Sequence, residues 1–240
     1  PIGWEKWLLD MVGIATIADM VPLVGENRAL ASFGLTVLKK SPREGLQALC
    51  RKLLVRQSEL AEDDIGFLIA PRVNAASRMD CSELAFRLLT TTDSRDAEAL
   101  ADELEHLNAK RKGVVAGLVK EVKRAAQKRF PNEQMVVLGN PLWKPALLGL
   151  AANALVEERG GAVCLWGRDG SGALKGSCRS DGSVNIARMF EAAHIRDVLE
   201  ESGGHAMAGG FSVSLDEVHH LPELFARAAM SAHGGVHTPG

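Results

Sequence analysis

Apolar residues recur every three or four positions through the first half of the chain, the periodicity of helices that bury one face. The same spacing continues from Leu100 to Val122, so residues 93–129 are predicted to form one long helix, closed by Phe130-Pro131-Asn132. Gly113 is a point where this helix could bend. Shorter helices are predicted over residues 4–12, 27–39, 46–55 and 82–90.

After Pro131 the pattern changes to short apolar runs that alternate with helical stretches, which indicates an α/β fold. We place a domain boundary near residue 131. The chain then divides into residues 1–92, a connecting helix over 93–131, a second domain over 132–232 and a disordered Gly- and Pro-rich tail over 233–240. Strands are predicted over 135–139, 162–167, 173–179 and 211–214, and helices over 145–158, 184–193, 196–201 and 217–231.

The composition is that of an ordinary globular protein, with 46% hydrophobic and 24% charged residues. It argues against a disordered, fibrous or disulfide-stabilised chain. No apolar run approaches the roughly 20 residues that a membrane helix needs. The formal net charge of -2 hides an uneven distribution, because residues 93–105 are acidic and residues 108–129 are basic. The basic half could face a nucleic acid, but by itself it is more simply a solvated helix face.

The four cysteines lie far apart and form no Cys-x-x-Cys pair, so we expect free thiols in a reducing cytosol rather than a metal site or a disulfide. There is no tyrosine, and aromatic residues make up 5% of the chain. A nucleic-acid surface here would therefore depend on charge and backbone contacts more than on base stacking. The cysteines are Cys50, Cys81, Cys164 and Cys178.

Two segments of the first domain carry residues that packing alone does not explain. In residues 13–23, Asp19 is one carboxylate in an apolar run, which suits either a metal ligand or a cap or turn before Pro22. Residues 71–80 place Arg72, Asn74 and Arg78 among small residues, where a phosphate could approach. The alternative is that these arginines form ordinary ion pairs with carboxylates.

Two further segments lie in the second domain. Residues 175–180, Lys-Gly-Ser-Cys-Arg-Ser, combine cations with the hydroxyl groups of Ser177 and Ser180, a set of donors that suits phosphate. Residues 202–210 surround His205 with glycines, and we interpret them as a loop that leaves the imidazole unobstructed. The sequence contains no Walker A loop, no Gly-x-Ser-x-Gly elbow, no dinucleotide fingerprint and no His-Glu-x-x-His site.

Taken in this order, the four segments resemble the RecJ branch of the DHH phosphoesterase superfamily. The members of this branch are single-strand-specific 5′→3′ DNA exonucleases. The resemblance extends from about Leu9 to Phe225. The resemblance implies the C-terminal part of a DHH domain, mostly helical here, then a long connecting helix and a smaller DHH-associated α/β domain with a mixed sheet. The basic half of the helix would line the groove between the domains. Lys144 and Ser77 depart from the family pattern, and the role of position 144 is open.

The resemblance also implies roles for individual residues. Asp19 would hold catalytic Mn²⁺ or Mg²⁺ in a two-metal phosphodiester hydrolysis, and His205 would contact the scissile phosphate. The DNA phosphates would be bound by residues of both domains. These residues are Arg72, Asn74, Arg78, Ser177, Arg179, Ser180, Gly203 and Gly204.

We expect most of the metal site to come from outside this sequence, because the family's Asp-x-Asp, further Asp and Asp-His-His motifs would lie before Pro1. This chain alone would then be inactive. The implied setting is cytoplasmic DNA repair and recombination, with single-stranded DNA as substrate and a single-strand-binding protein or helicase as candidate partners. Two alternatives stay open: a DHH phosphodiesterase of short oligonucleotides or cyclic dinucleotides, and a binding module that does not cut.

Overall fold

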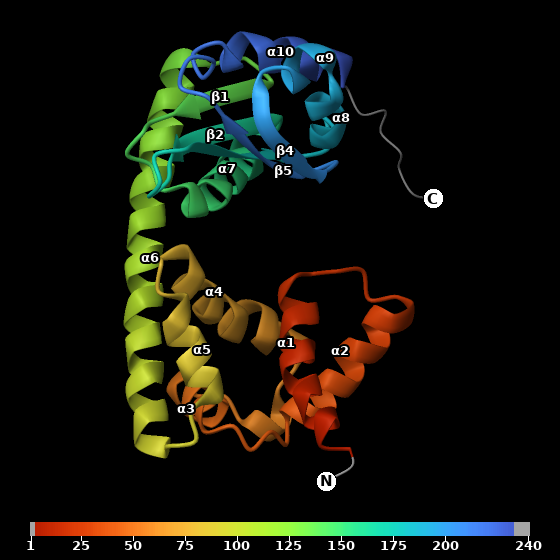
Figure 1. Ribbon diagram of the computed structural model, residues 1–240, viewed down its shortest axis with the longest axis vertical. Helices are drawn as coiled ribbons and strands as arrows, with labels where there is room; N and C mark the ends of the chain where they lie inside the picture. The colour runs from red at the N-terminus through yellow and green to blue at the C-terminus, as the bar shows by residue number, and fades with distance from the viewer. Residues whose placement is uncertain (1–2, 233–240) are drawn as a thin grey trace. The chain divides into compact units, whose positions relative to one another are not determined.

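The computed structural model describes residues 3–232 (Figure 1). The predicted disordered tail over 233–240 lies outside the described residues. The chain divides into two compact units, Pro1–Lys112 and Gly113–Gly240. The dividing point falls inside the long helix, at Gly113, rather than near residue 131, because each half of that helix packs into a different unit.

The first unit is helical throughout its described part, as its apolar periodicity predicts. Its core is formed by leucine, isoleucine and alanine side chains from every long helix of the unit, and Leu46, Leu49 and Leu88 are fully buried. The elements are η1 (Trp4–Leu8), α1 (Leu9–Ala18), α2 (Gly25–Leu38), α3 (Glu44–Leu53), η2 (Gln57–Glu59), η3 (Asp64–Ile69), α4 (Ala70–Arg78) and α5 (Ser82–Thr90).

A buried ion pair joins α1 to the start of α3. Asp10 is 1% exposed, and one of its carboxylate oxygens accepts hydrogen bonds from Arg43 Nε at 2.7 Å and from Ser41 Oγ at 2.6 Å. Arg43 also donates to the carbonyl oxygen of Leu89, 3.1 Å away. These bonds compensate the cost of removing the Asp10 carboxylate from water.

The long helix α6 (Ser94–Arg129) runs without a break through Gly113. Its early apolar residues, among them Leu100 and Leu104, lie in the core of the first unit. Its later ones, Leu118 and Val122, lie in a core of the second unit. Asp96 in the first turn and the basic Lys128 and Arg129 in the last turn suit the helix dipole. Most of the basic side chains are exposed.

The second unit contains a mixed five-stranded sheet in the order β1-β2-β3-β5-β4. Strands β1 and β2 are parallel and the remaining neighbours are antiparallel, which confirms the mixed sheet. The elements are β1 (Met135–Gly139), α7 (Pro145–Arg159), β2 (Ala162–Arg168), β3 (Leu174–Ser180), α8 (Ile186–Glu191), α9 (Ala193–Arg196), β4 (Leu199–His205), β5 (Ala208–Val213) and α10 (Leu221–Ser231).

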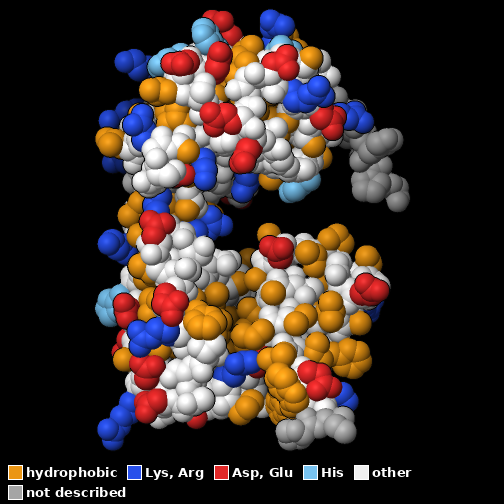
Figure 2. All heavy atoms as spheres, viewed as in Figure 1, with side chains coloured by type: hydrophobic (Ala, Val, Ile, Leu, Met, Phe, Trp, Pro, Cys, Tyr) orange, Lys and Arg blue, Asp and Glu red, His pale blue; other side chains and the backbone are white. Residues whose placement is uncertain are grey.

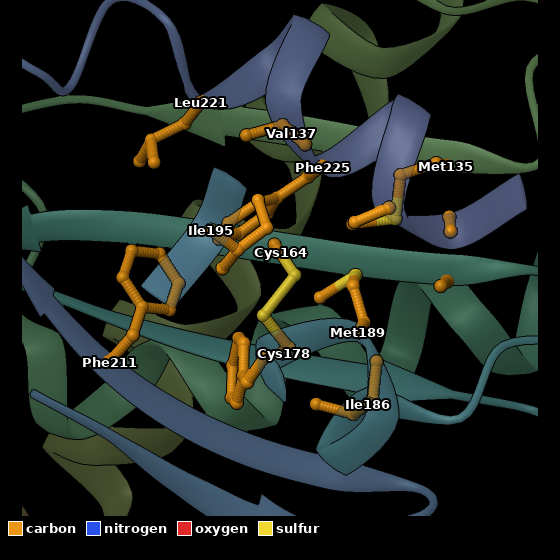
Figure 3. Close-up of a cluster of buried hydrophobic side chains, with 14 of the residues drawn as sticks. Met135, Val137, Cys164, Cys178, Ile186, Met189, Ile195, Phe211, Leu221 and Phe225 are labelled. Atoms are coloured by element: carbon orange, nitrogen blue, oxygen red, sulfur yellow. A yellow bond between two sulfur atoms is a disulfide. The ribbon is translucent and has the colours of Figure 1, made fainter. Parts of the chain in front are cut away.

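Helices cover both faces of this sheet. One face packs against α8, α9 and α10 through a core that includes Phe190, Phe211 and Phe225, whose rings meet edge-on or tilted (Figure 3). The other face packs against α7 and the second half of α6. Successive residues of a strand point to opposite faces, so each strand supplies both cores.

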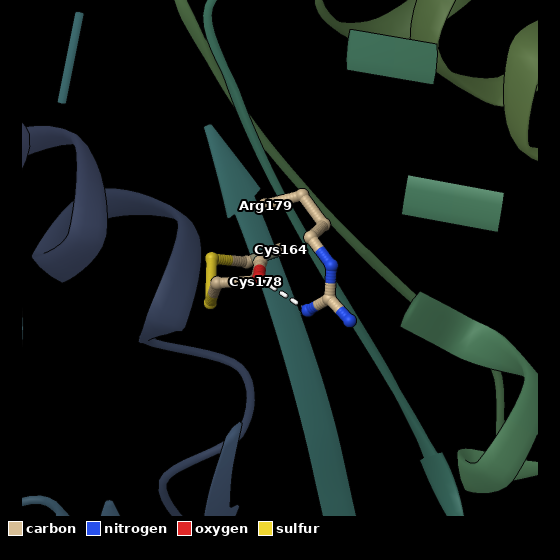
Figure 4. The surroundings of a disulfide bond; sticks show 3 residues. All are labelled: Cys164, Cys178 and Arg179. Atoms are coloured by element: carbon tan, nitrogen blue, oxygen red, sulfur yellow. Dashed lines mark hydrogen bonds between the residues drawn. A yellow bond between two sulfur atoms is a disulfide. The ribbon is translucent and has the colours of Figure 1, made fainter. Parts of the chain in front are cut away.

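The expectation of four free thiols is wrong for two of them. Cys164 and Cys178 form a disulfide between β2 and β3 (Figure 4). The two residues are directly opposite each other in the antiparallel register, with their Cα atoms 4.1 Å apart. They are 14 positions apart in sequence, and only the strand pairing brings them together. Cys50 is a buried thiol and Cys81 an exposed one.

Two local predictions are corrected, and one further element is found. Residues 196–201 are not helical, because α9 ends at Arg196 and β4 begins at Leu199. The Gly-rich segment around His205 is a β-hairpin rather than a loop, since β4 and β5 pair on either side of Ala206-Met207. The apolar stretch over 64–69 is a turn of π-helix, and it leads into α4.

The first unit exposes apolar side chains over α1, α2 and the segment between them, which Figure 2 shows as a gathering of hydrophobic atoms. Large examples are Met20 at 85% exposure, Val24 at 71% and Phe33 at 64%. No helix in the described part of the chain is long and apolar enough to cross a membrane.

Candidate nucleic-acid interface

The phosphate-binding candidates of residues 175–180 divide between the two faces of β3. Lys175, Ser177 and Arg179 alternate with buried neighbours and lie together on the face that α7 covers. Cys178 lies on the opposite face, where its disulfide enters the core beneath α8 and α10. Figure 4 shows the Arg179 side chain and the disulfide on opposite sides of β3.

The strand register brings the two predicted segments of this unit together. Ser177 lies opposite Gly210 of β5, which in turn lies opposite Gly203 of β4. In the neighbouring row, Arg179 and His205 both lie opposite Ala208. Directly opposite residues share a face of the sheet, and two strand spacings separate the outer strands by about 10 Å.

The row of Ser177, Gly210 and Gly203 lies in a shallow groove of about 470 Å³. The row of Arg179, Ala208 and His205 is the next one along the same face of the sheet and lies beside this groove. The middle strand of the groove is β5, and its central residue there is Gly210. Because Gly210 has no side chain, a ligand in the groove can approach the backbone of β5. The groove is lined by Pro145, Lys175, Gly176, Ser177, Glu201, Ser202, Gly203, Gly210, Phe211 and Ser212.

The charges at the end of the groove are partly compensated. Lys175 Nζ lies 3.0 Å from a carboxylate oxygen of Asp169. The hydrogen bond from Ser171, followed by that from Lys175, holds the pKa of Asp169 well below its usual range. Glu201 is exposed and adds a negative charge near the same end. An anionic ligand is therefore favoured toward the Ser177–Arg179 end.

Arg179 occupies space that a glycine of α7 leaves open. A β-carbon on Gly149 would lie 2.7 Å from Arg179 Nη2 and 3.2 Å from its Cζ. Arg179 Nη1 donates to the carbonyl oxygen of Cys178, 2.8 Å away. The guanidinium is thus placed by its own strand on one side and by the first turns of α7 on the other.

His205 is the last residue of β4 and is exposed, beside the turn of the hairpin. Its Nδ1 lies 3.4 Å from the backbone nitrogen of Met207, which leaves Nε2 pointing away from this contact. The neighbouring Gly204 has φ +154°, and a β-carbon there would lie 2.3 Å from the carbonyl oxygen of Ala208. Glycine at 204 therefore permits the close strand pairing that positions His205.

Ser180 does not join this face. It is 5% exposed, and its Oγ accepts hydrogen bonds from the backbone N–H groups of Gly182 at 3.1 Å and Val184 at 3.3 Å. The alternation along β3 points it into the core side of the sheet. Its hydroxyl stabilises the chain reversal that follows β3 rather than the predicted phosphate contact.

In the first unit, Asp19 is exposed and sits at the C-terminal cap of α1. Its backbone N–H donates to the carbonyl oxygen of Ala15. Within residues 3–232, no three His, Cys, Asp or Glu side chains come together as a metal centre needs. Asp19 supplies one carboxylate, and the described residues alone do not fit a two-metal centre.

The residues predicted to bind phosphate in this unit lie on α4. Asn74 is exposed and Arg78 is half-buried in the last turn. Arg72 instead forms a bidentate pair with Glu105 of α6, at 2.5 Å and 3.3 Å, and donates to the carbonyl oxygen of Leu68. The ion-pair alternative therefore describes Arg72, whereas the roles of Asn74 and Arg78 stay predictions.

Comparison with known proteins finds a family match within the second unit. Residues 132–231 match the DHHA1 domain family. The single-stranded-DNA-specific exonuclease RecJ of Bacillus subtilis is 35% identical over 222 residues, which are 92% of this chain and 28% of that protein. RecJ of Escherichia coli is 32% identical over 234 residues, covering 91% of this chain and 39% of that protein.

Solved structures agree over both units. RecJ of Thermus thermophilus in complex with Mn²⁺ gives a TM-score of 0.82 at 30% identity, over 96% of this chain and 34% of that one. Over nearly its whole length, the chain is similar to RecJ-type DHH proteins. A manganese-bound exonuclease RecJ gives a TM-score of 0.71 at 31% identity, over 95% of this chain and 55% of that one. The chain thus spans about two fifths or less of these curated RecJ relatives.

Some groups that shape this candidate surface carry no signal in the sequence. Gly149 lies within an ordinary helical pattern, and its importance appears only where Arg179 packs against it. Ala208 and Gly210 lie between the candidate residues of β3 and β4, and this placement depends on the register. Lys144 takes the N-cap position of α7.

Proposed function

We propose that this chain is the DNA-binding part of a single-stranded-DNA-specific 5′→3′ exonuclease, which hydrolyses phosphodiester bonds with the help of Mn²⁺ or Mg²⁺. The likeness to RecJ proteins supports the reaction class and the substrate. The polarity, the two-metal mechanism and the role in DNA repair and recombination are parts of the same proposal. A single-strand-binding protein or a helicase is the proposed class of partner.

One observation carries the proposal: β3, β5 and β4 place Ser177, Arg179 and His205 on one face around a floor of small residues. A guanidinium, a hydroxyl and exposed backbone are donors that suit a phosphate. Small residues between them let a strand lie close to the sheet. The scarcity of aromatic side chains favours contacts to the sugar-phosphate backbone over stacking on bases.

His205 is the proposed contact to the scissile phosphate. It lies across Ala208 from Arg179, so the two side chains can reach the same phosphate or adjacent ones. An imidazole N–H would donate to an oxygen whose negative charge grows during hydrolysis. Asp19 is the proposed metal carboxylate of this chain, with the other ligands supplied by residues outside it.

The first test is binding of a 3′-fluorescein-labelled single-stranded dT15 to the chain, measured by fluorescence anisotropy. We expect Arg179→Gln to weaken binding about tenfold, since a charge-assisted hydrogen bond contributes roughly 1.5–3 kcal/mol. Arg168→Gln is the matched control, because Arg168 is an exposed arginine at the end of β2 that lies opposite Leu174, on the other face of the sheet. An equal loss of dT15 affinity in both variants would show that Arg179 contributes only through its positive charge and not through a specific contact.

Length dependence separates a polymer from a small ligand. Affinity that rises from dT3 to dT15 supports a DNA strand as substrate, whereas equal affinities would favour short oligonucleotides. For the catalytic role, His205→Ala in a complete RecJ-type enzyme that contains this sequence is expected to lower turnover much more than DNA affinity. Equal losses of turnover and affinity would make His205 a binding residue only.

A further inference from the structure

The buried face of α6 contains two polar residues where its pattern calls for apolar ones. Ala97, Leu100 and Leu104 follow one another at three- and four-residue steps and are at most 3% exposed in the core of the first unit. The next positions of the same stripe are Asn108 and Arg111. Asn108 is fully buried, and Arg111 is half-buried.

Packing does not account for this pair. Arg111 Nη2 donates to Asn108 Oδ1 at 2.9 Å, and this bond fixes the direction of the guanidinium. Asn108 Nδ2 and Arg111 Nε are both buried without a hydrogen-bond partner among the described residues. Unsatisfied buried donors destabilise a fold, and a leucine at position 108 would avoid one of them.

The surrounding charges make the site electropositive. Burial lowers the pKa of Arg111, and the charges of Arg78 and Arg72 lower it further, so three guanidinium groups interact. Glu105 compensates Arg72 through its bidentate pair. Arg111 Nη2 contacts a neutral amide instead of a carboxylate. An anion that accepts from the Nη groups of Arg111 would relieve the repulsion among the three guanidinium groups.

We propose that Arg111 binds a phosphodiester group of a single-stranded DNA chain, and that Asn108 is the positioning residue that directs the Arg111 guanidinium toward it. This inference rests on the proposed function and adds to it a phosphate site in the first unit, on the buried stripe of α6. The guanidinium is suited to the role because two of its N–H groups can meet two phosphate oxygens.

The test compares Arg111→Gln with Lys112→Gln in the whole chain. Both variants remove one positive charge from the same turn of α6, but Lys112 is exposed. The probe is 3′-fluorescein-labelled dT15, titrated between 50 and 200 mM NaCl. We expect Arg111→Gln to weaken binding about tenfold and to lower the slope of log K against log[NaCl] by about 0.7, the value for one phosphate on a single strand. Lys112→Gln is expected to weaken binding about twofold.

Asn108→Leu separates positioning from a purely structural role. Leucine fills a similar volume without a buried donor, so we expect the melting temperature to stay the same or rise while DNA affinity falls at least threefold. A melting temperature that falls with unchanged affinity would make Asn108 structural and overturn the assignment. Asn108→Leu also keeps the proposal testable if Arg111→Gln does not fold.

The outcomes distinguish this inference from the function on which it rests. If the unmodified chain binds no dT15, the proposed function fails, and this inference fails with it. If the chain binds dT15 but Arg111→Gln and Lys112→Gln weaken binding equally, only this inference fails. Thymidine 5′-monophosphate should compete no better than inorganic phosphate. Stronger competition that Arg111→Gln abolishes would assign the site to a free mononucleotide and overturn the DNA-chain assignment.

Discussion

Gly149→Ala is expected to stabilise the fold and weaken DNA binding at the same time. The new β-carbon would lie 2.7 Å from Arg179 Nη2, whereas carbon contacts are comfortable at about 3.5–4.0 Å. The guanidinium must therefore move by about 0.8 Å or more. Because it is the far end of a flexible side chain, we expect the side chain to move and the backbone of α7 to stay in place.

The two effects have separate magnitudes. Alanine is favoured over glycine inside a helix by about 0.8–1 kcal/mol, so the free energy of unfolding should rise by up to about 1 kcal/mol and the melting temperature by roughly 2–4 °C. Displacing Arg179 should remove about half of the binding free energy that its charge-assisted hydrogen bond contributes. A loss of about 1 kcal/mol in binding corresponds to roughly a fivefold weaker affinity for dT15.

The assay pairs thermal unfolding with anisotropy, and Gly117→Ala is the matched control. Gly117 lies in α6, and a β-carbon there would meet nothing within 4 Å, so this variant should gain helix stability without losing affinity. Combining Gly149→Ala with Arg179→Gln should bind no more weakly than Arg179→Gln alone, since both act through one guanidinium. The reasoning is refuted if Gly149→Ala binds like Gly117→Ala, or if the two losses simply add.

Three further outcomes are expected. Ser180→Ala should destabilise the chain by about 1–2 kcal/mol in chemical denaturation, because two backbone N–H groups lose their acceptor, yet leave dT15 affinity within twofold; a large loss of affinity would restore Ser180 to the binding site. Arg43→Ala should cost about 3 kcal/mol in the same assay by leaving the Asp10 carboxylate buried and unpaired, and a cost below about 1 kcal/mol would contradict this account. Ellman's reagent at pH 8 should label the exposed Cys81 and spare Cys50, because burial raises the pKa of the Cys50 thiol to about 11; rapid labelling of both thiols would show that this core opens.

Helices α2, α3, α5 and the long α6 were predictable because each buries one face, and that requirement leaves a period of three to four residues in the sequence. Helix α4 and the second half of α1 were not predicted. Strand β1 and helix α5 were likewise predicted with their observed bounds. Strand β4 was not. Residues 200–205 of this strand, Glu-Glu-Ser-Gly-Gly-His, contain no alternation of apolar and polar side chains, and all six are exposed. It is a strand because β5 supplies hydrogen-bond partners, which is a long-range effect.

The candidate site was also predictable only in part. The sequence by itself indicated which side chains could carry chemistry, because Arg179, His205 and Asp19 are unusual in their local surroundings. Only the tertiary structure decided which of them share a surface. It placed Arg179 and His205 in one row across Ala208, turned Ser180 to the opposite face, and paired Arg72 with Glu105.

The physical reason is that residue type determines the chemistry of a side chain, whereas the register of the strands determines which other side chains lie next to it. A shift of one residue along β3 would exchange the faces of Arg179 and Cys178. It would bury a charge and separate the cysteine from Cys164, so the disulfide and the groove both depend on one strand pairing. Local sequence sets helix periodicity and donor chemistry, and the pairing of distant strands then selects which donors meet.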